Sequence, residues 1–301
     1  MIKTVLGEIV EKDIGITLPH EHICCYSEYV HKMIGTTYID KEKLLKVSAD
    51  YLKTLKEKYD LKTFIDCTPI NIGRDIELLK KISEKSGINI ICSTGFYYTE
   101  EPVLYNTSID ALCDYLVIDA ENVNAGIIKC AVESEDITGF NEKLLRASAK
   151  AQLKLNLPIV LHTNAKNKNG IKALEIILSE GVKTGAITVS HLSDTDDVEY
   201  INYFAECGCY LGLDRLHENC SQEYVESYIK IITGLCEEGY TNKIILSHDA
   251  LFFNGFDKKP KISETPRFNY CFDYIFPKLQ KHFTEQIMID NVLKMLKCEN
   301  S

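Results

Sequence analysis

The chain has 301 residues, of which 45% are hydrophobic and 26% are charged, and its formal net charge at pH 7 is -10. This composition is that of a globular protein with a full hydrophobic core. The negative charge argues against a nucleic acid or an anionic membrane surface as a partner.

The N-terminal sequence and the cysteines indicate where the protein works. MIKTVLGEIVEKD has no cationic segment followed by an apolar one, and no apolar run approaches the roughly 20 residues that span a bilayer. The twelve cysteines are scattered and form no Cys-x-x-Cys pair. We therefore expect a reduced, cytoplasmic protein with a small-molecule substrate, and we leave open whether it forms a homodimer.

Short β-rich runs alternate with amphipathic stretches along the chain. The runs cover residues 15–22, 63–69, 89–98, 125–132, 158–165, 186–193, 209–217 and 243–250. Most are apolar on both faces, which predicts a parallel sheet covered by helices. Eight such units predict an α/β fold, a (β/α)₈ TIM barrel, as one domain over residues 1–301. A doubly wound open sheet is the alternative, and the first dozen residues should form a short N-terminal hairpin.

The first run, GITLPHEHICC, carries two histidines one residue apart. In an extended strand His20 and His22 share a face and Glu21 points the opposite way. Two imidazoles on one face can bind one metal ion, although an isolated His-x-His is more often incidental.

The ends of other runs also carry groups that can bind a metal. In a barrel these ends converge on one face, where catalytic groups lie. The candidates are His20, His22, Lys129, His162, His191 and Asp249. A single histidine at a strand end is more often structural, and Asp249 could cap the next segment. Their coincidence on one rim favours a metal site, from which His248 should point away.

Lys129 is unusual because it lies inside the apolar run AGIIKCAV. A buried ammonium carries a large desolvation cost and would repel a cation. An uncharged amine can instead react with carbon dioxide to give a carbamate, which is anionic and can bridge two metal ions. The alternative is a lysine paired with a nearby carboxylate.

Six motifs together resemble one known family. HEH, AGIIK, VLHTNA, SHLSDTDD, LGLDR and SHDA, in this order, are similar to the phosphotriesterase-like family of the amidohydrolase superfamily, which includes lactonases. The resemblance extends from TVLGEIV to FPKL and implies a TIM barrel with two divalent metal ions, usually zinc, cobalt, manganese or iron. By similarity, the buried ion would be bound by His20, His22 and Asp249. The more exposed ion would be bound by His162 and His191, and a carboxylated Lys129 would bridge the two ions.

The resemblance also implies a mechanism. Two neighbouring cations lower the pKa of a bridging water, so that a hydroxide nucleophile exists at neutral pH. The counterpart of Asp249 handles the proton of this hydroxide, and the counterparts of Tyr97 and Arg215 face the substrate. Lys129 and Asp249 are thus the expected catalytic residues.

The loops after the strands should choose the substrate, above all residues 251–267. GFYY, GLDR and PRFNY are similar to the family's lactonases, which favours a lactonase or carboxylic esterase with weak phosphotriesterase activity. Phe252 and Phe253 would suit an apolar substrate arm. Arg267, with the loop lysines, would suit a phosphorylated sugar lactone, unless those lysines are only a solvated loop face.

An alternative of another class is a metal-bearing protein that binds its ligand without turnover. The presence of every expected ligand, Asp249 included, argues for catalysis.

Overall fold

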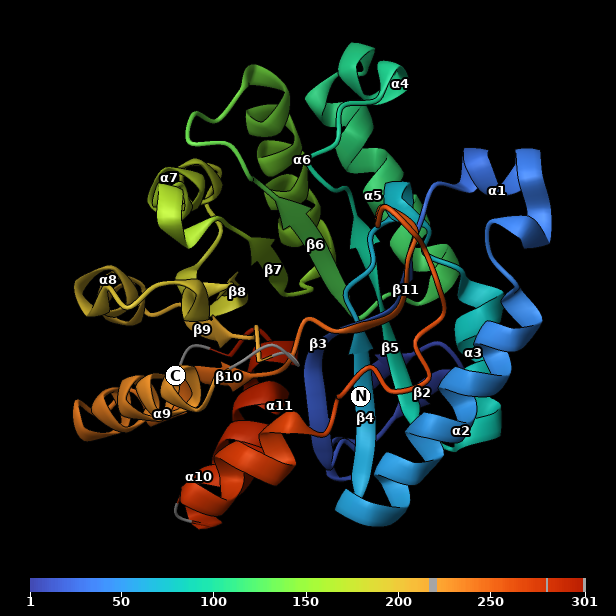
Figure 1. Ribbon diagram of the computed structural model, residues 1–301. Helices are drawn as coiled ribbons and strands as arrows, with labels where there is room; N and C mark the ends of the chain where they lie inside the picture. The colour runs from blue at the N-terminus through green and yellow to red at the C-terminus, as the bar shows by residue number, and fades with distance from the viewer. Residues whose placement is uncertain (217–220, 280, 300–301) are drawn as a thin grey trace.

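The computed structural model describes residues 1–216, 221–279 and 281–299, and its centre is a curled parallel sheet (Figure 1). Each predicted run overlaps one strand of this sheet. The strands are β3 (Ile16–Cys25), β4 (Leu61–Asp66), β5 (Asn89–Gly95), β6 (Ile127–Ala131), β7 (Ile159–His162), β8 (Ile187–Ser190), β9 (Tyr210–Leu213) and β10 (Ile244–Leu246). The spatial order of β3 to β10 is their sequence order. The predicted TIM barrel is therefore confirmed, because the order of a doubly wound sheet would reverse.

The first and last strands of the barrel meet through a short segment that the sequence did not predict. Strand β11 (Leu251–Asn254) pairs in parallel with β3, with Leu251 opposite His22. The backbone N–H of Asp249 donates to the carbonyl of His20 at 3.1 Å, and that of His22 donates to the carbonyl of Ala250 at 3.0 Å. This junction brings Asp249 beside the His-x-His motif.

Helices cover the outside of the barrel (Figure 1). They are α1 (Glu28–Ile34), α2 (Lys41–Tyr59), α3 (Ile76–Ser86), α4 (Pro102–Asn106), α5 (Ile109–Val123), α6 (Gly139–Leu155), α7 (Gly170–Ser179), α8 (Val198–Cys207), α9 (Gln222–Glu237), α10 (Lys281–Glu285) and α11 (Asn291–Leu296). Several begin at a Ser, Thr or Asp whose side chain accepts a backbone N–H three residues later, as Asp40 does from Lys43 in α2. No helix of the described residues is both long and apolar enough to span a membrane.

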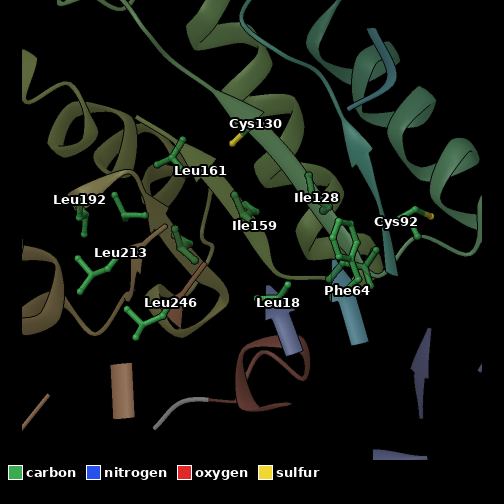
Figure 2. Close-up of a cluster of buried hydrophobic side chains, with 14 of the residues drawn as sticks. Leu18, Phe64, Cys92, Ile128, Cys130, Ile159, Leu161, Leu192, Leu213 and Leu246 are labelled. Carbon is green, nitrogen blue, oxygen red and sulfur yellow. The ribbon is translucent and has the colours of Figure 1, made fainter. Parts of the chain in front are cut away.

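Side-chain alternation along the strands makes two cores. The outer core lies between barrel and helices and contains Ile128 and Cys130 of β6 (Figure 2). The inner core contains Ile127, so Lys129, two residues later on the same strand, also faces the barrel interior. Antiparallel β1 (Ile2–Thr4) and β2 (Gly7–Ile9) form the predicted hairpin.

Strand β3 departs from simple alternation. Leu18 packs in the outer core, and the pairing of β3 with β4 shifts register between Leu18 and Glu21. This irregularity lets His20 face the barrel interior although it lies two residues after Leu18. His20 and His22 then lie on one side, with ring centroids 5.8 Å apart, as the sequence predicts.

The loop after β10 corrects one expectation about substrate choice. Phe252 and Phe253 are buried, with exposed fractions of 0% and 2%. Phe252 packs edge-on against Tyr51 and Phe268, and Phe253 packs edge-on against Tyr38. Both phenylalanines belong to the hydrophobic core, so they are not a substrate-binding surface.

Candidate active site

The six predicted metal ligands meet at the C-terminal end of the barrel. The side-chain atoms closest to one another are Lys129 Nζ and His20 Nε2 at 2.7 Å, His162 Nδ1 and His191 Nε2 at 2.7 Å, and His22 Nε2 and Asp249 Oδ1 at 3.1 Å. The four imidazoles and Lys129 are buried. The chain thus gathers, from five different strand ends, donor groups that were separated by up to about 230 positions in sequence.

Backbone geometry at the site is unusual at two of these residues. His191 and Asp249 have φ angles of 67° and 50°, in the left-handed region that residues other than glycine rarely adopt. Such conformations persist only where the surroundings enforce them, and they concentrate at functional sites. Glu21 provides one restraint, because its carboxylate accepts the backbone N–H of His248 and of Ala250, on either side of Asp249.

His248 itself lies away from the cluster, as expected. Its Nδ1 donates to Glu21 Oε1 at 2.6 Å, and its Nε2 accepts the backbone N–H of Cys271 at 3.0 Å. His248 therefore links the end of β10 to Glu21 of β3 and to the backbone of Cys271.

Each of the four clustered imidazoles has a partner on the nitrogen that turns away from the other ligands. These contacts are His20 Nδ1 with Asp214 Oδ2 at 2.6 Å, His22 Nδ1 with Thr68 Oγ1 at 2.8 Å, His162 Nε2 with Glu133 Oε2 at 3.0 Å and His191 Nδ1 with Asp214 Oδ1 at 2.9 Å. A carboxylate only accepts, so at His20, His162 and His191 it fixes the hydrogen on the outer nitrogen and leaves a lone pair on the inner one. This is the arrangement typical of metal-binding histidines.

Electrostatics favour a neutral imidazole at His20 and at His162. Burial lowers the pKa of His20 to about 4, assisted by the charge of Lys129, and burial with the charge of His191 holds the pKa of His162 well below its usual value. Burial would raise the pKa of Asp249, but the charge of His191 and the hydrogen bond from His22 outweigh it and hold that pKa well below its usual range. At neutral pH His20 and His162 are therefore neutral and Asp249 is ionised. At His22 burial lowers the pKa, but the charge of Cys25 and the hydrogen bond with Asp249 outweigh it and raise this pKa to about 10, so a cation bound there would displace a proton. Imidazole nitrogens and a carboxylate are a donor set that suits divalent cations.

Asp214, Glu133 and Thr68 were not predicted from the sequence. Asp214 could have been found, because it stands at the end of β9 inside LGLDR, where the criterion used for Asp249 also applies. Glu133 lies two residues beyond β6, and no local pattern links it to His162. These partners depend on contacts between different strand ends, both neighbouring and across the barrel, which the sequence does not display.

A cavity of about 430 Å³ opens above the cluster. It is lined by His22, Cys25, Pro69, Ile72, Tyr97, Tyr98, Thr99, Lys129, His162, Arg215, Asp249, Leu251, Asn254 and Phe256. Two of the three predicted substrate-binding residues, Tyr97 and Arg215, are therefore on its wall. Arg267 is exposed and is not among the lining residues, and the same is true of Lys258, Lys259 and Lys261.

Arg215 and Tyr97 contact the predicted ligands directly. Arg215 donates from Nε to Asp249 Oδ2 at 3.0 Å and from a terminal nitrogen to Asp194. The Tyr97 ring packs edge-on against His162, with centroids 5.3 Å apart. Burial raises the pKa of Tyr97, so its hydroxyl stays neutral and can donate a hydrogen bond.

Comparison with known proteins agrees with this geometry. Residues 1–300 match the model of the phosphotriesterase family. An aryldialkylphosphatase of Saccharolobus solfataricus is 31% identical over 95% of this chain and 94% of its own length. A phosphotriesterase homology protein of Mycobacterium tuberculosis is 28% identical, with 93% and 91% covered, and an N-acetyltaurine hydrolase of Xenopus tropicalis is 26% identical, with 97% and 95% covered.

The chain belongs to the phosphotriesterase family. It is a hydrolase, like the relatives whose names state an activity.

Proposed function

We propose that this hydrolase uses two divalent metal ions, zinc by preference, to open lactones or related carboxylic esters. The observation that carries the proposal is the cluster of four imidazoles, each with a partner on its outer nitrogen, around Lys129 and Asp249 at the base of a largely apolar cavity. In this account His20, His22 and Asp249 hold one ion, and His162 and His191 hold the other.

Lys129 would bridge the two ions as a carbamate. Its Nζ is buried and lies 2.7 Å from His20 Nε2, whereas no carboxylate of the described residues forms an ion pair with it. This weakens the alternative of a structural lysine–carboxylate pair. An uncharged amine adds to carbon dioxide and loses one proton, which gives an anionic carbamate with two oxygens. The carbamate provides a negative charge for the metal ions, whereas an ammonium would repel them.

Two bound divalent ions would supply a water of lowered pKa and a Lewis acid for the carbonyl oxygen of the substrate. The residues of this chain perform the proton transfers and the positioning. Asp249 is ionised and can take a proton at a carboxylate oxygen and pass it to the leaving group. Arg215 orients that carboxylate, and the neutral hydroxyl of Tyr97 can donate to an oxygen of the substrate.

The cavity favours an uncharged substrate with an apolar arm. Pro69, Ile72, Leu251 and Phe256 line it, and its two cationic residues are already engaged, Arg215 by two carboxylates. A phosphorylated sugar lactone or a sulfonated amide would lack an available cation among the described cavity residues. Phosphotriester hydrolysis, the activity in the name of one relative, is proposed as a weak side reaction.

A reducing, cytoplasmic location fits the thiols. The described cysteines are all free, and most are buried in the core.

The substrate assignment is tested with a panel of purified compounds. The panel contains γ- and δ-lactones with short and long acyl arms, an aryl carboxylic ester, a dialkyl aryl phosphate and N-acetyltaurine. The account expects the acyl lactones to have the highest kcat/KM. The kcat/KM for the phosphotriester should be lower by about 10²-fold or more. Tight lactone binding without turnover by the metal-loaded protein would instead support the alternative function, that of a metal-bearing protein that binds its ligand without catalysis.

A further inference from the structure

Asp214 contacts ligands of both proposed metal ions. Its Oδ2 lies 2.6 Å from Nδ1 of His20, and its Oδ1 lies 2.9 Å from Nδ1 of His191. The carboxylate is almost fully buried, with 1% of its side chain exposed. His20 belongs to the proposed buried site and His191 to the more exposed one, so a single carboxylate spans the two.

The two oxygens of Asp214 have different surroundings. Oδ1 also accepts the backbone N–H of His191 at 2.8 Å, which the left-handed backbone of His191 turns toward it. Oδ2 faces His20 in a space left by Gly212, where a Cβ would lie 2.9 Å from this oxygen. A carboxylate oxygen only accepts, so both oxygens act as acceptors toward these N–H groups.

The contact with Asp214 indicates where His20 carries its hydrogen. A carboxylate only accepts, so at 2.6 Å from Oδ2 the Nδ1 of His20 carries the hydrogen and Nε2 keeps its lone pair. Lys129 Nζ lies 2.7 Å from this Nε2, where an N–H of the lysine can donate to it.

We propose that Asp214 is a positioning residue that couples the two metal sites. By accepting the Nδ1–H of His20 and of His191, it keeps the Nε2 lone pair of each imidazole available to its own ion. The inference rests on the proposed binuclear centre. His20, His191 and Asp214 are close enough to hold an ion themselves, but a cation at Oδ1 would meet the backbone N–H of His191, so hydrogen bonding is the favoured role.

Asp214→Asn should separate the two sites. The backbone N–H of His191 requires an acceptor, so the amide oxygen takes the place of Oδ1 and the amide NH₂ takes the place of Oδ2. His20 must then accept on Nδ1 and carry its hydrogen on Nε2, where it cannot bind a metal ion. His191 keeps its acceptor, so the site that it shares with His162 should survive.

The test compares metal-stripped wild type, Asp214→Asn and a control, Asp119→Asn. Asp119 is a mostly buried carboxylate that pairs with Arg74 at 2.6 Å and has no contact with the clustered histidines. Zinc affinities are measured by competition with a chromophoric chelator, and histidine tautomers are read from ¹⁵N NMR spectra of the metal-free proteins.

Wild type and the control should bind two ions. Asp214→Asn should bind one ion with near wild-type affinity and the second about 100-fold more weakly, the upper end for loss of such a partner. Its His20 should change from the Nδ1–H to the Nε2–H tautomer. Two unchanged affinities, equal loss of both ions, or an unchanged His20 tautomer would overturn the role of Asp214.

Two further outcomes separate this inference from the proposed function. A wild-type chain that binds no zinc would overturn the binuclear centre. The tautomers are read without metal, so they test the positioning role of Asp214 independently of that result. If Asp214→Asn does not fold, the wild-type spectrum still decides, because an Nε2–H tautomer of His20 or His191 in the metal-free protein would contradict the inference.

Discussion

Arg215 donates from Nε to Asp249 Oδ2 at 3.0 Å, while the other oxygen of Asp249 lies 3.1 Å from His22 Nε2. One carboxylate therefore faces the proposed metal ligands with one oxygen and a guanidinium with the other. A second bond from Arg215 to Asp194 holds the guanidinium in place. This chain of contacts fixes the group that we propose as the proton carrier.

Arg215→Lys should lower kcat more than it raises KM for an uncharged lactone. A single ammonium cannot reproduce the planar fork that engages Asp194 and Asp249 together. We expect kcat to fall by roughly 10- to 100-fold, the effect of misorienting a general base. Steady-state kinetics with a short-chain lactone measure the change, and Arg267→Ala, on the exposed loop, serves as control. An unchanged kcat would show that Asp249 does not depend on Arg215.

Lys129→Ala should lose most of its bound metal and its activity. Without the carbamate, the two proposed ions lack their shared anionic ligand. Short carboxylic acids such as formate or propionate should restore part of both, because they supply two oxygens in the space vacated by the side chain. Metal analysis with and without the acids tests this, and full metal content in the unsupplemented variant would contradict the bridge.

Phe256→Ala should raise KM for long-chain acyl lactones and leave short-chain lactones nearly unchanged. Phe256 lines the cavity and is 61% exposed, so it can cover an apolar arm of the substrate. Loss of that contact should cost about 1 to 2 kcal/mol, equivalent to a roughly 5- to 30-fold change. Tyr274→Ala, also exposed but not among the lining residues, is the matched control. Equal effects on long and short chains would remove Phe256 from substrate selection.

Phe252→Ala should destabilise the fold without changing the choice of substrate. The side chain is fully buried against Tyr51 and Phe268, and such truncations cost about 3 to 5 kcal/mol. Chemical denaturation gives the free energy of unfolding, and the ratio of long-chain to short-chain kcat/KM should match wild type. A changed ratio with unchanged stability would reverse the roles assigned here to Phe252 and Phe256.

Much of the fold could be predicted from periodicity. Runs that are apolar on both faces and separated by amphipathic stretches are compatible with few folds other than a barrel or an open sheet. In a barrel, residues at strand ends such as His162 and Asp249 then lie on one rim. Strand β11 was not predicted because Phe252 and Phe253 read equally well as a loop that contacts substrate. Only the pairing of this segment with β3, a contact across most of the chain, buries them.

The ligands of the candidate site were easier to predict than their partners. His20 and His22 are marked by spacing, and Lys129 by a charge in an apolar run. Glu133 and Thr68 act through hydrogen bonds between adjacent strands, whereas Asp214 contacts His191 from the adjacent strand and His20 across the barrel. Their positions follow from register and from the local irregularity in β3. Arg267 was chosen for its charge, yet charge alone does not show whether a loop turns toward the cavity.

The most direct test of the binuclear hydrolase is a zinc titration of metal-stripped protein in which bound metal and lactone turnover are measured in the same samples. The account predicts two ions per chain and activity that returns as the second site fills. Asp249→Asn should retain much of the metal but reach a kcat/KM about 10²-fold or more below wild type, because the proton carrier is lost. Full turnover by the metal-stripped chain, or wild-type turnover by Asp249→Asn, would contradict it.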